Sequence, residues 1–159
     1  MRRYIRELTF SLVALLVIAL DQVSKFFIKA NMNLGQSIPD EGLFRITYST
    51  NEGMVFGLFA NQTFLITLTA IVGIAAIIIY SRYPMFNHAL VRVALGLMLG
   101  GAIGNLIDRI RLGEVTDFID VGAWPVFNLA DSAVVVGVVL VIFYLLFVQG
   151  KGALKRKDA

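Results

Sequence analysis

The 159-residue sequence contains no cysteine, a single histidine, His88, and only three prolines, and 16% of its residues are charged. The absence of cysteine excludes disulfide scaffolds, thiol nucleophiles and cysteine-ligated metal sites. One histidine is also too few for the ligand sets of most hydrolytic zinc sites. Hydrolytic chemistry in this chain is therefore left to carboxylates, lysine, serine or threonine.

Apolar residues dominate what remains. They make up 58% of the chain, and the mean hydropathy is +0.79, which is more than a soluble domain of this size can bury. Four apolar runs are long enough to cross a hydrocarbon layer about 30 Å thick. They cover approximately residues 8–28, 63–80, 89–107 and 130–148. We therefore expect an all-α polytopic membrane protein with four transmembrane helices, formed as a single domain over residues 1–159.

The first apolar run also has features of a secretory signal peptide, because Arg2, Arg3 and Arg6 precede it. The sequence after Leu20 lacks a small-residue cleavage pattern, however, and the helical pattern continues to Phe27. These two observations favour an uncleaved first span.

Charge is divided between the two ends of the spans. Most of the 14 basic residues lie before the first span, between the second and third, or after the fourth, whereas most of the 11 acidic residues lie at the opposite ends. Because basic residues concentrate on the cytoplasmic side, both termini are predicted to be cytoplasmic. The net charge of +3 is explained by this topology and gives no reason to expect nucleic-acid binding.

Two further patterns concern local structure. Residues 43–48 are rich in β-branched and aromatic side chains and are followed by the turn signal Asn51–Gly53, which predicts a small extracytoplasmic β element. In the third apolar run Gly96, Gly100 and Gly104 recur every four residues, a pattern typical of close packing between membrane helices.

Polar residues gather at the outer ends of the spans, where ionisable groups are costly and are candidates for function. Asp21 and Lys25, four residues apart, fit an interfacial ion pair with a snorkelling lysine. Asn128 and Asp131 fit a helix N-cap and its third helical residue. A further set of charged residues is interpreted as solvated or interfacial: Glu52, Asp108, Arg111, Glu114 and Asp120.

Elimination leaves a pair of carboxylates as the candidate chemistry. A serine triad fails because His88 lies in the predicted cytoplasmic connection, where a surface histidine is expected. Asp117 and Asp131, if they converge, can share one proton, so that one activates water while the other protonates an amide carbonyl. Two other functions remain open, a proton-coupled transporter that uses Asp21, Asp117 and Asp131, and a non-enzymatic scaffold built on the glycine stripe.

Five blocks of this sequence resemble, in order, the signature blocks of the bacterial lipoprotein signal peptidases (signal peptidase II). The blocks are Asp21–Lys25, Asn51–Gly57, Gly100–Arg109, Gly113–Phe118 and Phe127–Ser132. The resemblance covers nearly the whole chain and includes the four-span topology. Met54–Val55 departs from it, because relatives often carry smaller residues there.

The resemblance implies an intramembrane aspartic endopeptidase that needs no metal or cofactor. It implies that the enzyme cleaves the signal peptide from prolipoproteins, at the amide before a cysteine that carries a diacylglyceryl group. Asp117 and Asp131 match the catalytic pair of the family, and further positions match supporting or substrate-binding residues: Asp21, Lys25, Asn51, Gly53, Asn105, Arg109 and Asn128. It also implies location in the bacterial inner membrane among lipids, an active site near the outer face, and inhibition by cyclic peptides such as globomycin. Trp124 is expected to be an aromatic anchor at the membrane interface.

Overall fold

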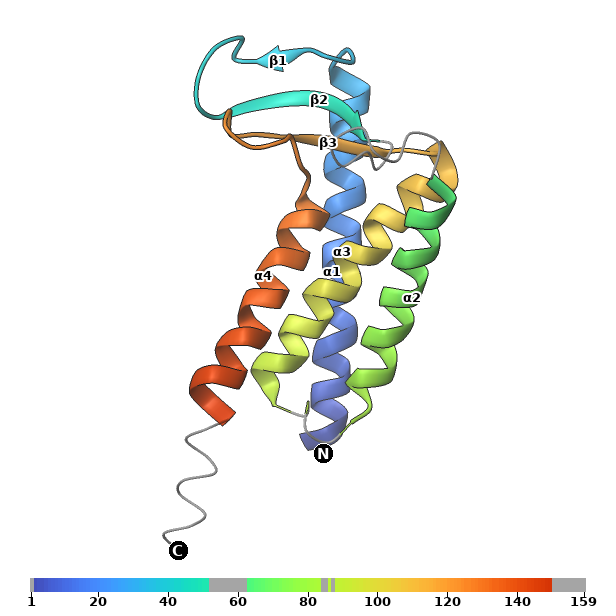
Figure 1. Cartoon of the computed structure of the whole chain (residues 1–159), viewed down its shortest axis with the longest axis vertical. Coiled ribbons are helices and arrows are strands. Elements are labelled where there is room, and N and C mark those ends of the chain that lie inside the picture. The colour runs from blue at the N-terminus through green and yellow to red at the C-terminus, as the bar shows by residue number, and fades with distance from the viewer. Residues whose placement is uncertain (1, 52–62, 84–85, 87, 150–159) are drawn as a thin grey trace, which may run out of the picture.

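The computed structural model describes residues 2–51, 63–83, 86 and 88–149, which form a helix bundle with a small sheet at one end (Figure 1). The bundle consists of α1 (Arg2–Asn31), α2 (Thr63–Ser81), α3 (Ala89–Leu112) and α4 (Leu129–Phe143), and α4 continues as a π-helical segment over Tyr144–Gln149. The sheet contains β1 (Ser37–Ile38), β2 (Arg45–Asn51) and β3 (Val115–Asp120), antiparallel and in that order.

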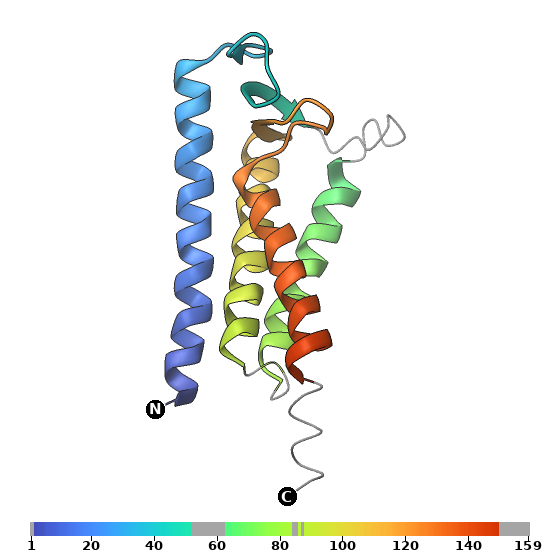
Figure 2. The ribbon, with the colours of Figure 1, turned by 90° about the vertical axis from the view of Figure 1, so that its left-hand side faces the viewer.

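Four helical segments in the described part of the chain are long and apolar enough to cross a membrane. Helix α3 lies in the centre and packs against α1, α2 and α4 (Figures 1 and 2). Large apolar side chains on the outer faces of the other helices are exposed, as expected for surfaces that contact lipid. The predicted fold class, four apolar helices with a small β element, is confirmed.

The bounds of α3 differ from the prediction. The third run was expected to end near residue 107, but the helix continues to Leu112, so that Asp108 and Arg109 are helical. It ends because Gly113 adopts a left-handed conformation, with φ of 83°, and donates its N–H to the carbonyl of Arg109. Hydropathy falls at the charged residues, whereas the backbone leaves the helix only at this glycine.

The glycine stripe of α3 faces α1. A Cβ atom on Gly100 would lie 2.7 Å from the carbonyl oxygen of Ala14, and one on Gly104 would lie 2.6 Å from a carboxylate oxygen of Asp21. A Cβ atom on Gly96 would lie 2.9 Å from the carbonyl oxygen of Phe10, also in α1. The stripe therefore lets the two helices approach closely, as its spacing predicted.

Strands β2 and β3 are joined by an ion pair at one end of their ladder. Arg45 contacts Asp120 through Nη2 at 2.6 Å and through Nε at 3.0 Å. The interpretation of Asp120 as a solvated charge is wrong, because its carboxylate is buried in the sheet and also accepts hydrogen bonds from the Gly122 N–H and the Thr47 hydroxyl. These hydrogen bonds hold the pKa of Asp120 below its ordinary value, and the bond from the Gly122 N–H has the largest effect.

A second ion pair lies at the end of the bundle away from the sheet. Arg92 of α3 is 2% exposed and forms two hydrogen bonds with Glu7 of α1, at 3.0 and 3.1 Å. Nearby, His88 caps α3 by accepting the Leu90 N–H, and its ring stacks on Tyr144 with centroids 4.8 Å apart. His88 is exposed, as expected of a surface histidine.

Candidate active site

The candidate site lies at the end of the bundle that carries the sheet, where α4 begins. Asn128 is the N-cap of α4: its side-chain oxygen accepts the Asp131 N–H at 2.9 Å, and the Asp131 carboxylate accepts the Asn128 N–H at 3.3 Å. The predicted cap is confirmed, and it is a reciprocal capping box. Both side chains are thereby fixed to the backbone of the first helical turn.

Two asparagines connect the two candidate catalytic aspartates. Asn128 Nδ2 donates to Asp117 Oδ1 at 2.6 Å, and Asn105 Nδ2 donates to Asp131 Oδ1 at 2.7 Å. Asn128 Nδ2 also donates to Asn105 Oδ1 at 3.1 Å, which links the Asn128–Asp117 pair to the Asn105–Asp131 pair. Side chains from β3, α3 and α4 thus form one hydrogen-bonded group around Asp117 and Asp131.

Asp117 is only 2% exposed. Burial, and next the negative charge of Asp131, raise its pKa to about 6, although hydrogen bonds from Asn128 and Asn51 and the charge of Lys25 act in the opposite direction. Asp117 consequently holds a proton up to a much higher pH than an ordinary aspartate. Asp131 is only partly buried.

Beside this pair lies a buried lysine. Lys25 Nζ contacts Asp21 Oδ2 at 2.9 Å, Asp108 Oδ2 at 3.1 Å and Asn105 Oδ1 at 2.9 Å, so all three of its N–H groups have acceptors. The predicted pairing with Asp21 is confirmed, but the expected snorkelling is wrong, because Lys25 is 1% exposed. The other oxygen of Asp21 accepts the Ala130 N–H at 3.1 Å, which ties α1 to the start of α4.

Asp108 is a site residue that the sequence interpretation missed. It was taken as a solvated charge, yet it is 2% exposed and accepts hydrogen bonds from Gln22 and from the Thr116 N–H in addition to its contact with Lys25. It therefore joins α3 to β3 next to Asp117. One signal was present in the sequence, since Asp108 lies three residues after Asn105 and so shares its helix face.

The remaining predicted residues lie around this group. Arg109 is partly buried, and its charge acts on Asp131, Asp117 and Asp108. Its Nε atom is buried without a hydrogen-bond partner in the described part of the chain. Asn51 is the last residue of β2 and hydrogen-bonds to Asp117. Gly53 and Glu52 of the predicted turn, together with Met54–Val55, lie outside the described residues.

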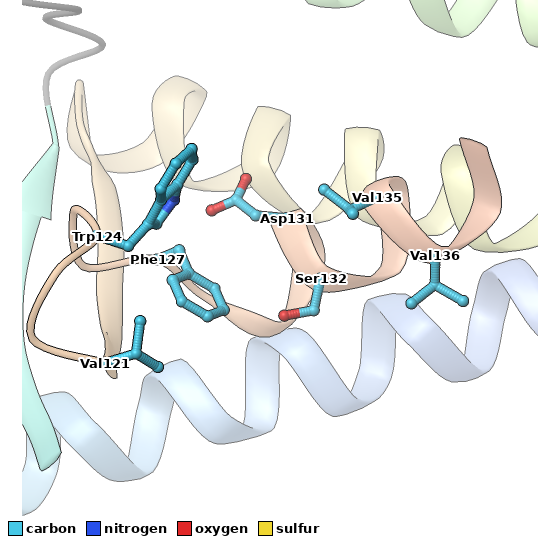
Figure 3. A pocket seen from close by; sticks show the side chains of 7 residues that line it. All are labelled: Val121, Trp124, Phe127, Asp131, Ser132, Val135 and Val136. Atoms are coloured by element: carbon cyan, nitrogen blue, oxygen red, sulfur yellow. The ribbon is translucent and has the colours of Figure 1, made fainter. Parts of the chain in front are cut away.

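A pocket of about 490 Å³ opens beside Asp131 (Figure 3). Its lining residues are Val121, Trp124, Phe127, Asp131, Ser132, Val135 and Val136. Figure 3 shows the Asp131 carboxylate pointing into the space beside the Trp124 ring, and Trp124 itself is 68% exposed. The pocket is thus mainly apolar with one carboxylate. Across the described residues, no three His, Asp or Glu side chains are grouped as a metal ion would require.

Comparison with known proteins agrees with the geometry. The family described as Signal peptidase (SPase) II matches residues 13–147. This chain belongs to the signal peptidase II family. It is 48% identical to the lipoprotein signal peptidase of Moorella thermoacetica over 144 residues, covering 89% of this chain and 95% of the relative. It is 46% identical to the lipoprotein signal peptidase of Bacillus subtilis over 155 residues, covering 92% and 97%.

Two solved structures, both described as bacterial membrane enzymes, share the fold of this chain. One matches with a TM-score of 0.81 at 33% identity, covering 89% of this chain and 94% of the other. The second has a TM-score of 0.80 at 34% identity, covering 87% of each. The resemblance seen in the five sequence blocks is confirmed: the protein is a multi-pass membrane peptidase of this family. None of these relatives supports the transporter alternative.

Proposed function

We propose that this member of the signal peptidase II family is an aspartic endopeptidase that removes signal peptides from lipid-modified prolipoproteins. Asp117 and Asp131 are its catalytic pair. The observation that carries the proposal is the joining of these two carboxylates, one fully buried and one facing a pocket, through Asn128 and Asn105. The names of the relatives and the sequence blocks point to the substrate, a precursor cleaved at the amide before its diacylglyceryl-modified cysteine.

Burial divides the roles of the two aspartates. Asp117 is enclosed, and its raised pKa of about 6 lets it keep a proton to higher pH than an ordinary aspartate, so it acts as the general acid. Asp131 faces the pocket and accepts one N–H on each oxygen, from Asn105 and from the Asn128 backbone, which suits an ionised general base. Two like charges this close do not both ionise cheaply, so the pair shares one proton.

The reaction then proceeds through a tetrahedral intermediate. Asp131 takes a proton from water while the water oxygen bonds to the amide carbon, and Asp117 gives its proton to the carbonyl oxygen. As the carbon–nitrogen bond breaks, Asp131 returns its proton to the departing nitrogen. Asp117 recovers a proton from one hydroxyl of the intermediate. One water is consumed, and both aspartates end in their starting states.

The membrane setting fits a lipidated substrate. The pocket beside Asp131 has apolar walls on α4 and on the connection from β3, next to surfaces that contact lipid. We place the protein in the bacterial inner membrane with both termini cytoplasmic and the sheet on the outer face. Two observations support this orientation. Helix α1 begins, and the helix that continues α4 ends, at the end of the bundle opposite the sheet (Figures 1 and 2), and in the sequence most basic residues adjoin the span ends on that side. Cyclic peptides of the globomycin type are expected to compete at this site.

The test is cleavage of a diacylglyceryl-modified precursor by the purified protein in lipid or detergent. Asp117→Asn and Asp131→Asn preserve size but replace the carboxyl group with an amide that can neither give nor take the proton, and each should lower the cleavage rate by about 10² to 10⁴-fold. Asp40→Asn, the same change at an exposed aspartate near the sheet, is the matched control and should retain activity. Undiminished hydrolysis by both variants of this catalytic dyad, Asp117 and Asp131, would contradict the assignment. No hydrolysis by the unmutated protein would reopen the transporter alternative.

A further inference from the structure

The orientations of both asparagine amides in the site are fixed by groups that only donate. The Asp131 backbone N–H bonds to the side-chain oxygen of Asn128, so the nitrogen of that amide must face Asp117 and Asn105. Lys25 likewise has no acceptor, and it bonds to the side-chain oxygen of Asn105. The nitrogen of Asn105 is therefore turned toward Asp131. Two amides that are free to flip in other settings each have one orientation here.

Lys25 is itself held in place from two sides. Asp21 one turn earlier on α1 and Asp108 on α3 both contact its ammonium, within 3.1 Å. Asp108 also accepts the Thr116 N–H, and Asp21 accepts the Ala130 N–H, so the two carboxylates are anchored to backbone on either side of the dyad. The ammonium therefore has a fixed position relative to Asn105.

We propose that Lys25 is a positioning residue: by donating to the side-chain oxygen of Asn105 it forces the amide nitrogen toward Asp131, and so keeps Asp131 the ionised member of the pair. This inference rests on the two-aspartate reaction proposed above. Lys25 is the shorter of two donors to this oxygen, at 2.9 Å against 3.1 Å for Asn128 Nδ2. Without Lys25 only the Asn128 donor remains, and the Asn105 amide can turn and present its oxygen to Asp131. Two oxygens share a hydrogen bond only if a proton lies between them, so Asp131 would then retain a proton and lose its capacity as a base.

A test has to separate the effect of the Lys25 charge on the two aspartates from its effect on the orientation of the Asn105 amide. The charged groups around the two aspartates come from two helices: Lys25 and Asp21 from α1, and Asp108 and Arg109 from α3. In addition, Asp117 of β3 and Asp131 of α4 act on each other. Removing the ammonium alone leaves two buried carboxylates without a cation and would disturb both aspartates. The double variant Lys25→Met/Asp108→Asn removes one positive and one negative charge, and an asparagine oxygen at 108 still accepts the Thr116 N–H.

The measurement is the pH dependence of kcat/KM for the lipidated precursor, which should be bell-shaped in the unmutated protein. In the double variant the acidic limb should move to higher pH by about one unit, which corresponds to loss of one hydrogen bond to a carboxylate. The basic limb, which reports Asp117, should also move to higher pH in the double variant, because the charge of Lys25 lowers the pKa of Asp117. The acidic limb is therefore the measure of amide orientation. Asn105→Ala should move the acidic limb by the same amount, and adding it to the double variant should cause no further shift.

The matched control is Glu7→Gln/Arg92→Met, which removes the other ion pair between α1 and α3, partly buried and at the far end of the bundle. It should lower thermal stability without moving either limb. A double variant with the unmutated pH profile, or shifts that add when Asn105→Ala is included, overturns the role of Lys25 while leaving the dyad intact. If the double variant does not fold, the pH profile of Asn105→Ala is the remaining test. An acidic limb that does not move in Asn105→Ala overturns the proposal. Retained activity in Asp117→Asn and Asp131→Asn, run alongside, would instead overturn the dyad itself.

Discussion

Replacement of Gly101 by alanine should damage both the stability and the activity of this enzyme. Gly101 lies on the face of α3 that contacts the first turn of α4. A Cβ atom there would overlap the carbonyl oxygen of Ala130 and would lie 2.8 Å from a methyl group of Val134. Because the carbonyl belongs to the backbone, no change of rotamer relieves the overlap, and the start of α4 has to move.

The size of the movement follows from the geometry. An ordinary contact starts at 3.4 Å, so the first turn of α4 must retreat by roughly 1 Å, and such overpacking costs about 1–3 kcal/mol of unfolding free energy. Asp131 follows Ala130 directly, and it meets Asn105, one turn along α3 from Gly101, at only 2.7 Å. A displacement of about 1 Å breaks this hydrogen bond, and misplacement of a catalytic group by that amount lowers kcat by about 10²-fold.

The assay compares kcat on the lipidated precursor and the thermal unfolding midpoint for two variants. Gly73→Ala in α2 is the control, because no described atom lies within 4 Å of a Cβ built there. It makes the same helix-favouring change without overlap and should match or exceed the stability of the unmutated protein. A Gly101→Ala protein that cleaves and unfolds like Gly73→Ala would refute the argument that α3–α4 contact places Asp131.

Three further outcomes are expected. Because Asp117 acts as an acid and loses its proton at about pH 6, kcat/KM should fall as the pH rises through that value; a profile that stays level from about pH 5 to about pH 8 contradicts this role. Asn128→Ala removes the α4 cap and the donor to Asp117, so thermal unfolding should show a loss of about 1–2 kcal/mol from the cap alone. Cleavage by that variant should fall as well, and an unchanged rate would show that Asn128 serves the helix only. EDTA should leave cleavage intact, whereas inhibition that added metal reverses would contradict a metal-free reaction.

Much of the fold was readable from the sequence because the bilayer leaves few alternatives. In hydrocarbon every backbone polar group must be satisfied within the segment, so each long apolar run has to be a helix. The local contacts that were predicted correctly follow from the spacing of residues along a helix. The three-residue interval from Asn128 to Asp131 predicts the capping box, and the four-residue interval from Asp21 to Lys25 predicts their contact.

Where the sequence interpretation was wrong, the error concerned burial. Asp108 and Asp120 were interpreted as solvated and Lys25 as snorkelling, because charged side chains at the ends of membrane spans are usually exposed to solvent. In the structure all three are buried, and each has partners from another element: Lys25 and Asp108 meet between α1 and α3, and Asp120 meets Arg45 across the sheet. Those partners are distant in the chain, so local spacing could place Asp108 on the helix face of Asn105 but could not show which groups of other elements these residues meet.

By itself, then, the sequence determined the four spans, a close-packing face on the third span, the cap of α4 and the family of the chain. Each of these depends on intervals of a few residues or on blocks of fixed order. Only the tertiary structure decided that Asn105 reaches Asp131, that Asn128 reaches Asp117, and that Lys25 fixes the amide between them. These contacts depend on which helix faces meet and how closely, and that is set by packing across the bundle.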